Sequence, residues 1–294
     1  AIGHTPLLKL NRVGKDVGAN VFVKLEHLNP SGSYKDRMAL SMIEAAERGD
    51  TWNHKQLKPG GTVIEASAGN TAPAVSMVCA AKGYDAHIYL YRYQMEDPKN
   101  ARLQITQAFG PTVKISSEPS VYMTEEQITE LSKTSPDLLH VLSAKMDCQV
   151  DAIGCSASSG ASLFGMIKGL ANHDVRPGVI FGVEPAGSEK YFDFEGDMAK
   201  YGEFTVSDDK TKIAEAIGLT KWVTEAPIVK TLLDAGYPDR IYCVSDEEAR
   251  AMANRLCQEE GIFCGMSSGA NVAVALRIAK ELGPGKNVVT TIVD

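Results

Sequence analysis

The chain has 294 residues, which at about 150 residues per domain predicts two domains or one large α/β body. Its 44% hydrophobic and 23% charged residues are typical of globular proteins and exclude collagen-like, mucin-like and disordered classes. With 30 basic and 37 acidic residues the net charge is −7, so we expect neither nucleic acid nor an anionic membrane surface as a partner.

Short apolar runs rich in β-branched residues alternate with segments of helical periodicity along the chain. The predicted strands cover residues 21–25, 62–65, 87–91, 112–115, 151–156, 179–184, 241–244 and 287–292. Helices are expected from Lys35 to Gly49, from Asn70 onward, after a capping box formed by Ser245 and Glu248, and from Ser268 to Gly283. This alternation predicts a mostly parallel sheet with helices on its faces.

Three further features of the sequence bear on where the protein acts. The polar stretch 116–147 has no clear strand pattern and is where we expect the chain to cross between domains. The longest nearly apolar run, 72–81, is far shorter than the roughly 20 residues of a membrane-spanning helix, so no such helix is expected and a cytoplasmic location is the default. The six cysteines and six histidines form no ligand-spaced cluster, so we predict no metal site.

Four short motifs lie where a loop leads into a predicted helix, and backbone N–H groups at such places point outward and bind anions. They cover residues 29–37, 65–71, 158–162 and 265–269. The first motif places Lys35 at a helix start, where the helix dipole disfavours a cation, and a neutral lysine is what Schiff-base chemistry requires. Taken alone, such a lysine is usually a solvated surface residue.

The motif at 158–162 offers three hydroxyls and several backbone donors on a tight turn, which can hold a phosphate without an arginine. Most Ser/Gly-rich turns are only turns, but beside a helix-start lysine this one suggests a phosphate-bearing aldehyde cofactor. The motif at 265–269 also matches the G-x-S-x-G nucleophile elbow of α/β-hydrolases. That interpretation fails on chain order, because no histidine follows His173.

In this order the four motifs resemble those of fold type II pyridoxal phosphate enzymes, in particular the cysteine synthase and cystathionine β-synthase family. Residues 2–7 resemble the family's opening I-G-x-T-P-L, and residues 181–185 resemble its V-I-G-V-E-P strand. The resemblance covers nearly the whole chain. It implies an α/β fold like that of the tryptophan synthase β subunit, with two three-layer αβα domains of mostly parallel sheet. The smaller, mobile domain would be 35–144, with the substrate carboxylate loop, and the larger pyridoxal phosphate domain 1–34 plus 145–294.

The resemblance also implies a role for single residues. Residues 29–37 match N-P-G-G-S-x-K-D-R, which makes Lys35 the catalytic Schiff-base lysine, with Asp36 and Arg37 as scaffold. Residues 65–71 match E-P-T-S-G-N-T, in which Asn70 would bind the cofactor's 3′ oxygen. The substrate carboxylate would be held by Ser67, Ala68, Gly69 and Thr71, and the cofactor phosphate by Ser158, Ser159, Gly160, Ala161 and Ser162. Ser267 falls on the serine at the pyridine nitrogen, a neutral group that cannot enforce a pyridinium and so favours elimination over transamination.

The chain departs from the family pattern mainly on the substrate side. Ala68 replaces a serine, Ser158 and Ala161 replace two phosphate-loop glycines, and residues 214–218 stand where the family has a Q-G-I-G loop. The region 110–151 is also shorter than the family pattern.

Taken together, these residues indicate a pyridoxal phosphate enzyme that performs β-replacement on an O-activated L-serine through an aminoacrylate. The substrate would be O-acetyl- or O-phospho-L-serine, a small nucleophile would be the second reactant, and the product cysteine or another β-substituted alanine. The resemblance further implies a homodimer. Two alternatives stay open: a serine or threonine dehydratase that stops after elimination, and a non-catalytic binding or regulatory protein on the same fold.

Overall fold

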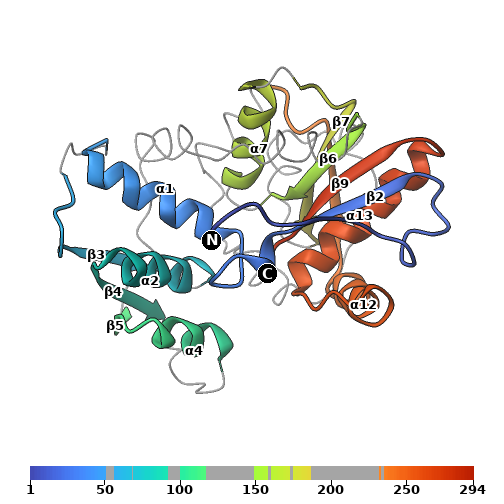
Figure 1. Cartoon of the computed structure of the whole chain (residues 1–294). Coiled ribbons are helices and arrows are strands. Elements are labelled where there is room, and N and C mark those ends of the chain that lie inside the picture. The colour runs from blue at the N-terminus through green and yellow to red at the C-terminus, as the bar shows by residue number, and fades with distance from the viewer. Residues whose placement is uncertain are drawn as a thin grey trace. The chain divides into compact units, whose positions relative to one another are not determined.

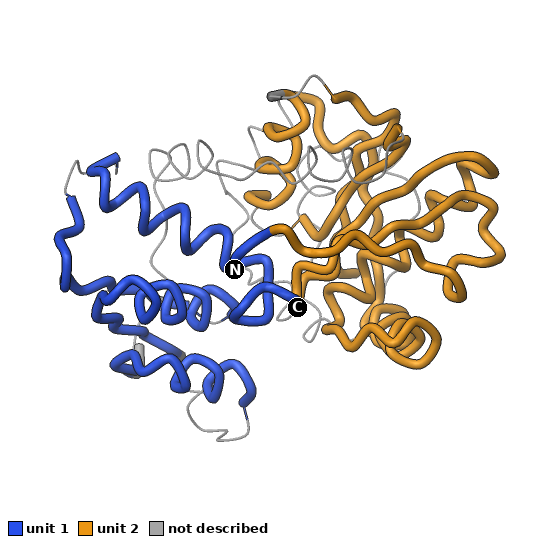
Figure 2. The backbone as a smooth tube through the Cα atoms, viewed as in Figure 1, with its two compact units in different colours: residues 1–3, 28–135 blue, residues 4–27, 136–294 orange. Residues whose placement is uncertain are grey.

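The computed structural model describes residues 1–50, 56–67, 69–91, 100–116, 149–157, 160–172, 175–186, 232 and 235–294. The chain divides into two compact units (Figure 2). Unit 1 comprises residues 1–3 and 28–135, and unit 2 comprises residues 4–27 and 136–294. The stretch in which we expected a domain crossing lies, after Ser116, outside the described residues.

Unit 1 is built on a three-stranded parallel sheet in the order β3-β4-β5 (Figure 1). The strands are β3 (Thr62–Ala66), β4 (Asp85–Tyr91) and β5 (Thr112–Ser116), and the helices are α1 (Lys35–Arg48), α2 (Thr71–Lys82) and α4 (Ala101–Ala108). The α2 helix packs against α1, α4 and the sheet. Its residues 72–79 are all buried, which explains why this helix lacks a polar face.

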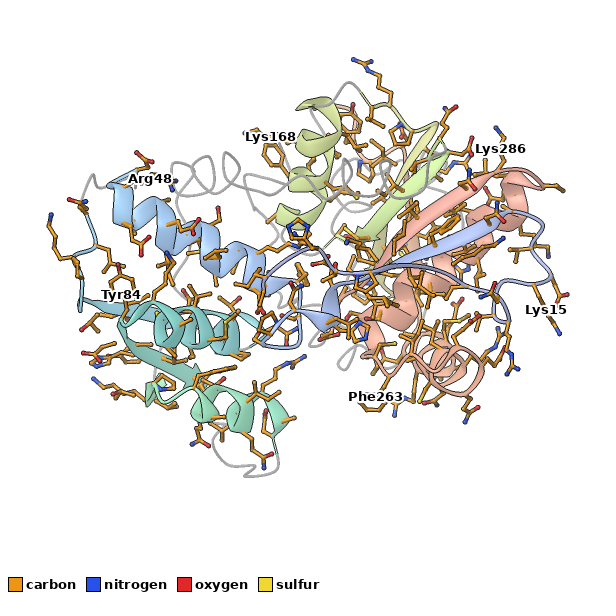
Figure 3. The ribbon with its side chains drawn as sticks, in the orientation of Figure 1. Lys15, Arg48, Tyr84, Lys168, Phe263 and Lys286 are labelled. Atoms are coloured by element: carbon orange, nitrogen blue, oxygen red, sulfur yellow. The ribbon has the colours of Figure 1, made fainter. Side chains whose placement is uncertain are left out.

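The ends of α1 and α2 are fixed by local chemistry. Gly49 and Gly83 adopt φ values of 78° and 77° after the two helices, a left-handed conformation that glycine reaches without steric penalty. Near this end the two helices are joined by Glu47, whose carboxylate accepts hydrogen bonds from Lys82 Nζ (2.9 Å) and Tyr84 Oη (2.9 Å) (Figure 3). Both bonds lower the pKa of Glu47.

Unit 2 is built on a six-stranded sheet in the order β1-β2-β9-β6-β7-β8. The strands are β1 (Leu7–Lys9), β2 (Asn20–Leu25), β6 (Ala152–Ser156), β7 (Val179–Pro185), β8 (Arg240–Val244) and β9 (Asn287–Ile292). All pairs are parallel except the edge pair β1 and β2. The helices are α7 (Ala161–Asn172), α12 (Asp246–Arg255) and α13 (Met266–Leu282), with a 3₁₀ turn at Glu26–Leu28 and a π-helical turn at Leu256–Glu260. The predicted α/β class with mostly parallel sheets is confirmed.

The α13 helix forms the centre of the unit 2 core. It packs on β2, β6, β8 and β9, and on its outer side it packs on α12 (Figure 1). The two helices approach closely at Gly269, where a Cβ atom would lie 2.1 Å from the Ala249 carbonyl oxygen. The predicted cap of α12 is present, since Ser245 Oγ accepts a hydrogen bond from Glu248 N at 3.2 Å.

The family-like opening of the chain is held by buried polar groups of unit 2. Lys24, on β2, is fully buried and donates a hydrogen bond to the Thr5 carbonyl oxygen. Thr5 Oγ1 in turn donates to the buried Glu26 carboxylate at 2.6 Å. Because buried polar groups need such partners, this network fixes the T-P-L segment at the start of β1. Lys24, Thr5 and Glu26 therefore have a structural role.

Candidate cofactor and substrate site

Lys35, the predicted Schiff-base lysine, is the first residue of α1. Its side chain is half-buried and its Nζ lies 4.8 Å from the centre of the Tyr34 ring, a cation–π distance. The backbone N–H of Lys35 donates to Ser33 Oγ at 3.2 Å. The loop before the helix therefore fixes the backbone from which this lysine extends.

Asp36 and Arg37, for which we expect a scaffold role, make contacts on both sides of the loop before α1. The Asp36 carboxylate is fully buried and accepts hydrogen bonds from Ser31 N (2.8 Å) and from Ser31 Oγ. Arg37 lies against Gly3, where a Cβ atom would be 3.0 Å from Arg37 Nη1, and the Gly3 φ of +85° also requires glycine. Gly3 N donates to Asn29 Oδ1 at 2.8 Å, so the chain start, the loop and α1 are joined.

The second motif of unit 1 connects β3 with α2. Ser67 Oγ accepts a hydrogen bond from Gly69 N at 3.1 Å, and Thr71 is the first residue of α2. The first turn of α2 contains no acidic residue, so its backbone N–H groups face no competing carboxylate from their own helix. A helix N-terminus of this kind suits a carboxylate ligand. Ala68 lies outside the described residues.

Asn70 precedes α2 and makes no cap to that helix with its side chain. Its Oδ1 instead accepts a hydrogen bond from Arg102 Nε, on α4, at 3.1 Å. An arginine nitrogen can only donate, so this bond fixes the amide orientation of Asn70: the oxygen faces Arg102 and the Nδ2 donors face elsewhere. Nothing in the sequence singled out Arg102, because its partner lies 32 residues away.

Glu65, the last residue of β3 but one, is an ionisable group that sequence reasoning left without a role. Burial raises the pKa of its carboxyl to about 7, and the charge of Lys35 opposes this shift. The carboxyl and the amine therefore lie within electrostatic range of each other. Its position as the first residue of the second motif was the one signal available in the sequence.

The phosphate-loop residues of unit 2 that the structure describes lie at the start of α7. Gly160 has a φ of +83°, and its carbonyl oxygen accepts a hydrogen bond from Phe164 N at 2.8 Å. Ala161 and Ser162 form the first turn, which contains no acidic residue. The backbone N–H groups of this first turn and the Ser162 hydroxyl are the kind of donors that an anion such as phosphate requires. Ser158 and Ser159 lie outside the described residues.

Ser267 is the second residue of α13 and is only 3% exposed. Its Oγ lies 3.0 Å from Asp294 Oδ1. The segment that follows β9 is tied to this helix start, since Gly265 N donates to the Asp294 carbonyl oxygen at 2.9 Å and Val293 N donates to Ser268 Oγ at 2.9 Å. Sequence reasoning did not identify Asp294, which belongs to no motif.

Within each unit, the structure brings several predicted residues together. In unit 1, Lys35 and the loop of Ser67, Gly69, Asn70 and Thr71 lie at the N-terminal ends of two helices that pack on each other. In unit 2, the loop before α7 follows β6, on which α13 with Ser267 packs. The described residues contain no group of three or more His, Cys, Asp or Glu side chains that could bind a metal ion, and no helix among them is long and apolar enough to cross a membrane.

Comparison with known proteins identifies the family. The family model described as pyridoxal-phosphate dependent enzyme matches residues 1–143 and 130–294. The chain belongs to the pyridoxal-phosphate dependent enzymes. A cysteine synthase of Staphylococcus aureus is 33% identical over 99% of this chain and 91% of its own length. Cystathionine β-synthase of Rattus norvegicus is 30% identical over the full chain, which corresponds to 52% of that protein.

Solved structures agree with this family. A hydrogen sulfide-producing enzyme from Fusobacterium nucleatum superimposes with a TM-score of 0.74 at 26% identity, covering 100% of this chain and 95% of that one. An O-ureido-L-serine synthase gives a TM-score of 0.71 at 25% identity, covering 100% of this chain and 89% of that one. The protein is therefore a cysteine synthase-like, pyridoxal phosphate-dependent enzyme of the β-replacement family.

The described residues fit this family's cofactor. Phosphate matches the N–H donors at the start of α7, a ring nitrogen matches the buried Ser267 hydroxyl, and an aldehyde matches the amine of Lys35.

Proposed function

We propose that this enzyme performs β-replacement on an O-activated L-serine, with O-acetyl- or O-phospho-L-serine as substrate and cysteine or a related β-substituted alanine as product. One observation carries the proposal: the Lys35 amine and the acid-free N-terminus of α2 lie at the ends of two helices that pack together in unit 1. A helix start without acidic residues, near the lysine that would hold the cofactor, is suited to the carboxylate of an amino-acid substrate. The names of the cysteine synthase and O-ureido-L-serine synthase relatives also support a serine-derived substrate.

In this proposal the chain's own residues bind and orient the reactants. Pyridoxal phosphate, when bound, supplies an aldehyde and an electron-withdrawing ring. Lys35 is the residue that would hold the cofactor at its aldehyde group, and its Nζ would carry the proton taken from the substrate Cα. The backbone and hydroxyls of Ser67, Gly69 and Thr71, with Ala68, hold the substrate carboxylate. Because Ala68 lacks the hydroxyl of the family's serine, we expect one hydrogen bond fewer on that carboxylate.

The remaining roles concern the cofactor alone. Residues Ser158, Ser159, Gly160, Ala161 and Ser162 hold the phosphate through N–H and hydroxyl donors, and Ser267 faces the ring nitrogen. Asn70 turns its amide nitrogen to the 3′ oxygen, an orientation that the bond from Arg102 Nε supports. By family resemblance we further propose a homodimer in the cytoplasm, and light scattering of the purified protein tests the oligomer.

The first test is the visible absorption spectrum of the purified protein, with Lys35→Ala as the variant. We expect a visible band that borohydride abolishes and that Lys35→Ala lacks. Addition of O-acetyl-L-serine or O-phospho-L-serine should shift this band, and an added thiol should restore it with formation of a β-substituted alanine. Lys168, on α7, belongs to none of the four motifs, so Lys168→Ala is the matched control and should keep the band (Figure 3).

The two alternatives give different results in the same assay. A dehydratase would release pyruvate and ammonia from serine without incorporating the thiol. A non-catalytic binding protein would show no band even after incubation with pyridoxal phosphate, and either result would contradict the proposed function.

A further inference from the structure

Asp294 lies at the N-terminus of α13, where the helix has no acidic residue of its own in the first turn and no side-chain cap. The Asp294 carboxylate is packed closely against this helix start, since a Cβ atom on Gly265 would lie 2.6 Å from Asp294 Oδ1. The partial positive charge of a helix N-terminus stabilises a carboxylate at this position. The Asp294 carboxylate is thus a hydrogen-bond partner of the Ser267 hydroxyl, at an Oγ–Oδ1 distance of 3.0 Å.

This contact fixes the direction of the Ser267 hydrogen bond. A hydroxyl has a single proton, whereas an ionised carboxylate has none to donate, so Ser267 Oγ donates to Asp294 Oδ1. The nearby His27 does not neutralise Asp294 at neutral pH, because burial lowers the pKa of its imidazole although Asp294 and Glu26 oppose that shift. With its proton engaged, Ser267 turns only lone pairs toward any other partner.

We propose that Asp294 is a positioning residue that makes Ser267 a hydrogen-bond acceptor toward the ring nitrogen of pyridoxal phosphate. An acceptor at that place favours a ring nitrogen that carries a proton, and the negative charge of Asp294 stabilises the resulting cation. The pair therefore differs from the isolated neutral serine that we expected from the sequence, which could donate its proton to an unprotonated ring nitrogen but could not enforce a pyridinium. The inference rests on the proposed function, in which Ser267 faces that nitrogen.

The test is ¹⁵N NMR of the enzyme loaded with pyridoxal phosphate labelled at the ring nitrogen, compared among the wild type, Asp294→Asn and Ser267→Ala. We expect the wild-type resonance in the range of the protonated ring. In Asp294→Asn the carboxamide can donate to Ser267 Oγ and release the hydroxyl proton toward the ring. The resonance should then move most of the way to the range of the unprotonated ring.

Two further variants separate this role from a purely structural one. Ser268→Ala removes a hydroxyl that also anchors the segment after β9, through Val293 N (2.9 Å) and the Asp294 carbonyl oxygen (3.3 Å), but leaves the Asp294 carboxylate in place. It should keep the wild-type resonance. Gly265→Ala changes no charge, and because its Cβ atom would lie 2.6 Å from Asp294 Oδ1 the carboxylate must leave its present position beside Ser267 Oγ. It should therefore move the resonance in the same direction as Asp294→Asn even where the latter folds poorly.

The outcomes distinguish this inference from the proposed function. A resonance that shifts in Ser267→Ala but stays unchanged in both Asp294→Asn and Gly265→Ala would overturn the role of Asp294 and leave the proposed site intact. A resonance unchanged in Ser267→Ala would show that Ser267 does not face the ring nitrogen, which removes both. A shift in Ser268→Ala equal to that in Asp294→Asn would assign Asp294 to anchoring alone.

Discussion

At the scale of single residues, the candidate site of unit 1 combines a lysine with a carboxyl group whose pKa lies well above its ordinary value. The pKa of Glu65 is raised to about 7 mainly by burial, and the charge of Lys35 opposes the shift. A group with a raised pKa destabilises the folded state as it ionises. Because the positive charge of Lys35 lowers the pKa of Glu65, loss of that charge would raise this pKa further.

We expect Glu65→Gln to stabilise the cofactor-free protein at pH 8 and to leave its stability unchanged at pH 4. The wild-type protein has its full stability below pH 4.5, the pKa of Glu65 in the unfolded chain. It loses the part that depends on a neutral Glu65 as the pH rises through about 7, the pKa of Glu65 in the folded protein. The gain at pH 8 should be at most about 3 kcal/mol, at 1.36 kcal/mol per pKa unit. Urea denaturation of both proteins between pH 4 and pH 8 measures it.

Glu47 provides a control of opposite sign, because hydrogen bonds from Lys82 and Tyr84 lower the pKa of Glu47. Glu47→Gln should reduce stability at neutral pH, and the difference should vanish as the pH falls below the unfolded pKa of 4.5. Equal pH profiles for Glu65→Gln and the wild type would show that Glu65 is not buried as a carboxylate.

A second prediction at this scale concerns Arg102. Arg102→Ala removes the donor that orients the Asn70 amide, so we expect about a tenfold weaker affinity for pyridoxal phosphate, the effect of one net hydrogen bond. Fluorescence titration of the cofactor-free protein measures the affinity. Gln104→Ala, on the exposed side of the same helix, is the control and should bind as the wild type does. Equal affinity of Arg102→Ala and the wild type would contradict an orienting role.

At the scale of elements, the start of α1 depends on a buried hydrogen-bonded turn. The Asp36 carboxylate accepts from both the backbone N–H and the hydroxyl of Ser31, and all these groups are buried. The same carboxylate lies in the first turn of the helix, where a negative charge is favourable. The hydrogen bonds between Ser31 in the loop and Asp36 in the helix therefore determine where the backbone of Lys35 lies.

We expect Asp36→Ala to destabilise the protein by about 1–3 kcal/mol, because it leaves two buried donors of Ser31 without an acceptor. Asp50→Ala is the matched control at the other end of α1. Asp50 pairs with Arg48 at 2.7 Å, but both side chains are more than half exposed, and we expect an unchanged unfolding midpoint (Figure 3). If both variants unfold at the wild-type midpoint, Asp36 does not hold the turn.

At the scale of the whole molecule, the strands and helices could be predicted where a periodic apolar pattern meets a clear end signal. The helix expected from Lys35 to Gly49 is α1, and the strand expected at 287–292 is β9. The short strand Leu7–Lys9 was missed because three residues are too few to show alternation, and it forms the antiparallel edge of a parallel sheet.

For the candidate site, the sequence indicated residues in local motifs and missed those that act across the fold. Lys35, Asn70 and Ser267 belong to contiguous motifs at helix starts. Arg102 and Asp294 approach Asn70 and Ser267 from 32 and 27 residues away, and such approaches depend on tertiary packing. Glu65 lies within a motif, but its raised pKa comes from burial, which a sequence pattern does not report. The roles assigned to the motif residues stay predictions until the spectra are measured.

The pairing of β2 with β9 also has a consequence for how the protein is made. Asn20 Nδ2 donates to Asn287 Oδ1 at 3.0 Å, across 267 residues of chain, and β9 is the parallel neighbour of β2 in the sheet. At translation rates of 5–20 residues per second, a newly made β2 waits roughly 15 to 50 seconds for that neighbour. During this time the unpaired backbone N–H and C=O groups along this edge of β2 are open to chaperones and to other nascent chains, and the sheet of unit 2 can close only after β9 has been made.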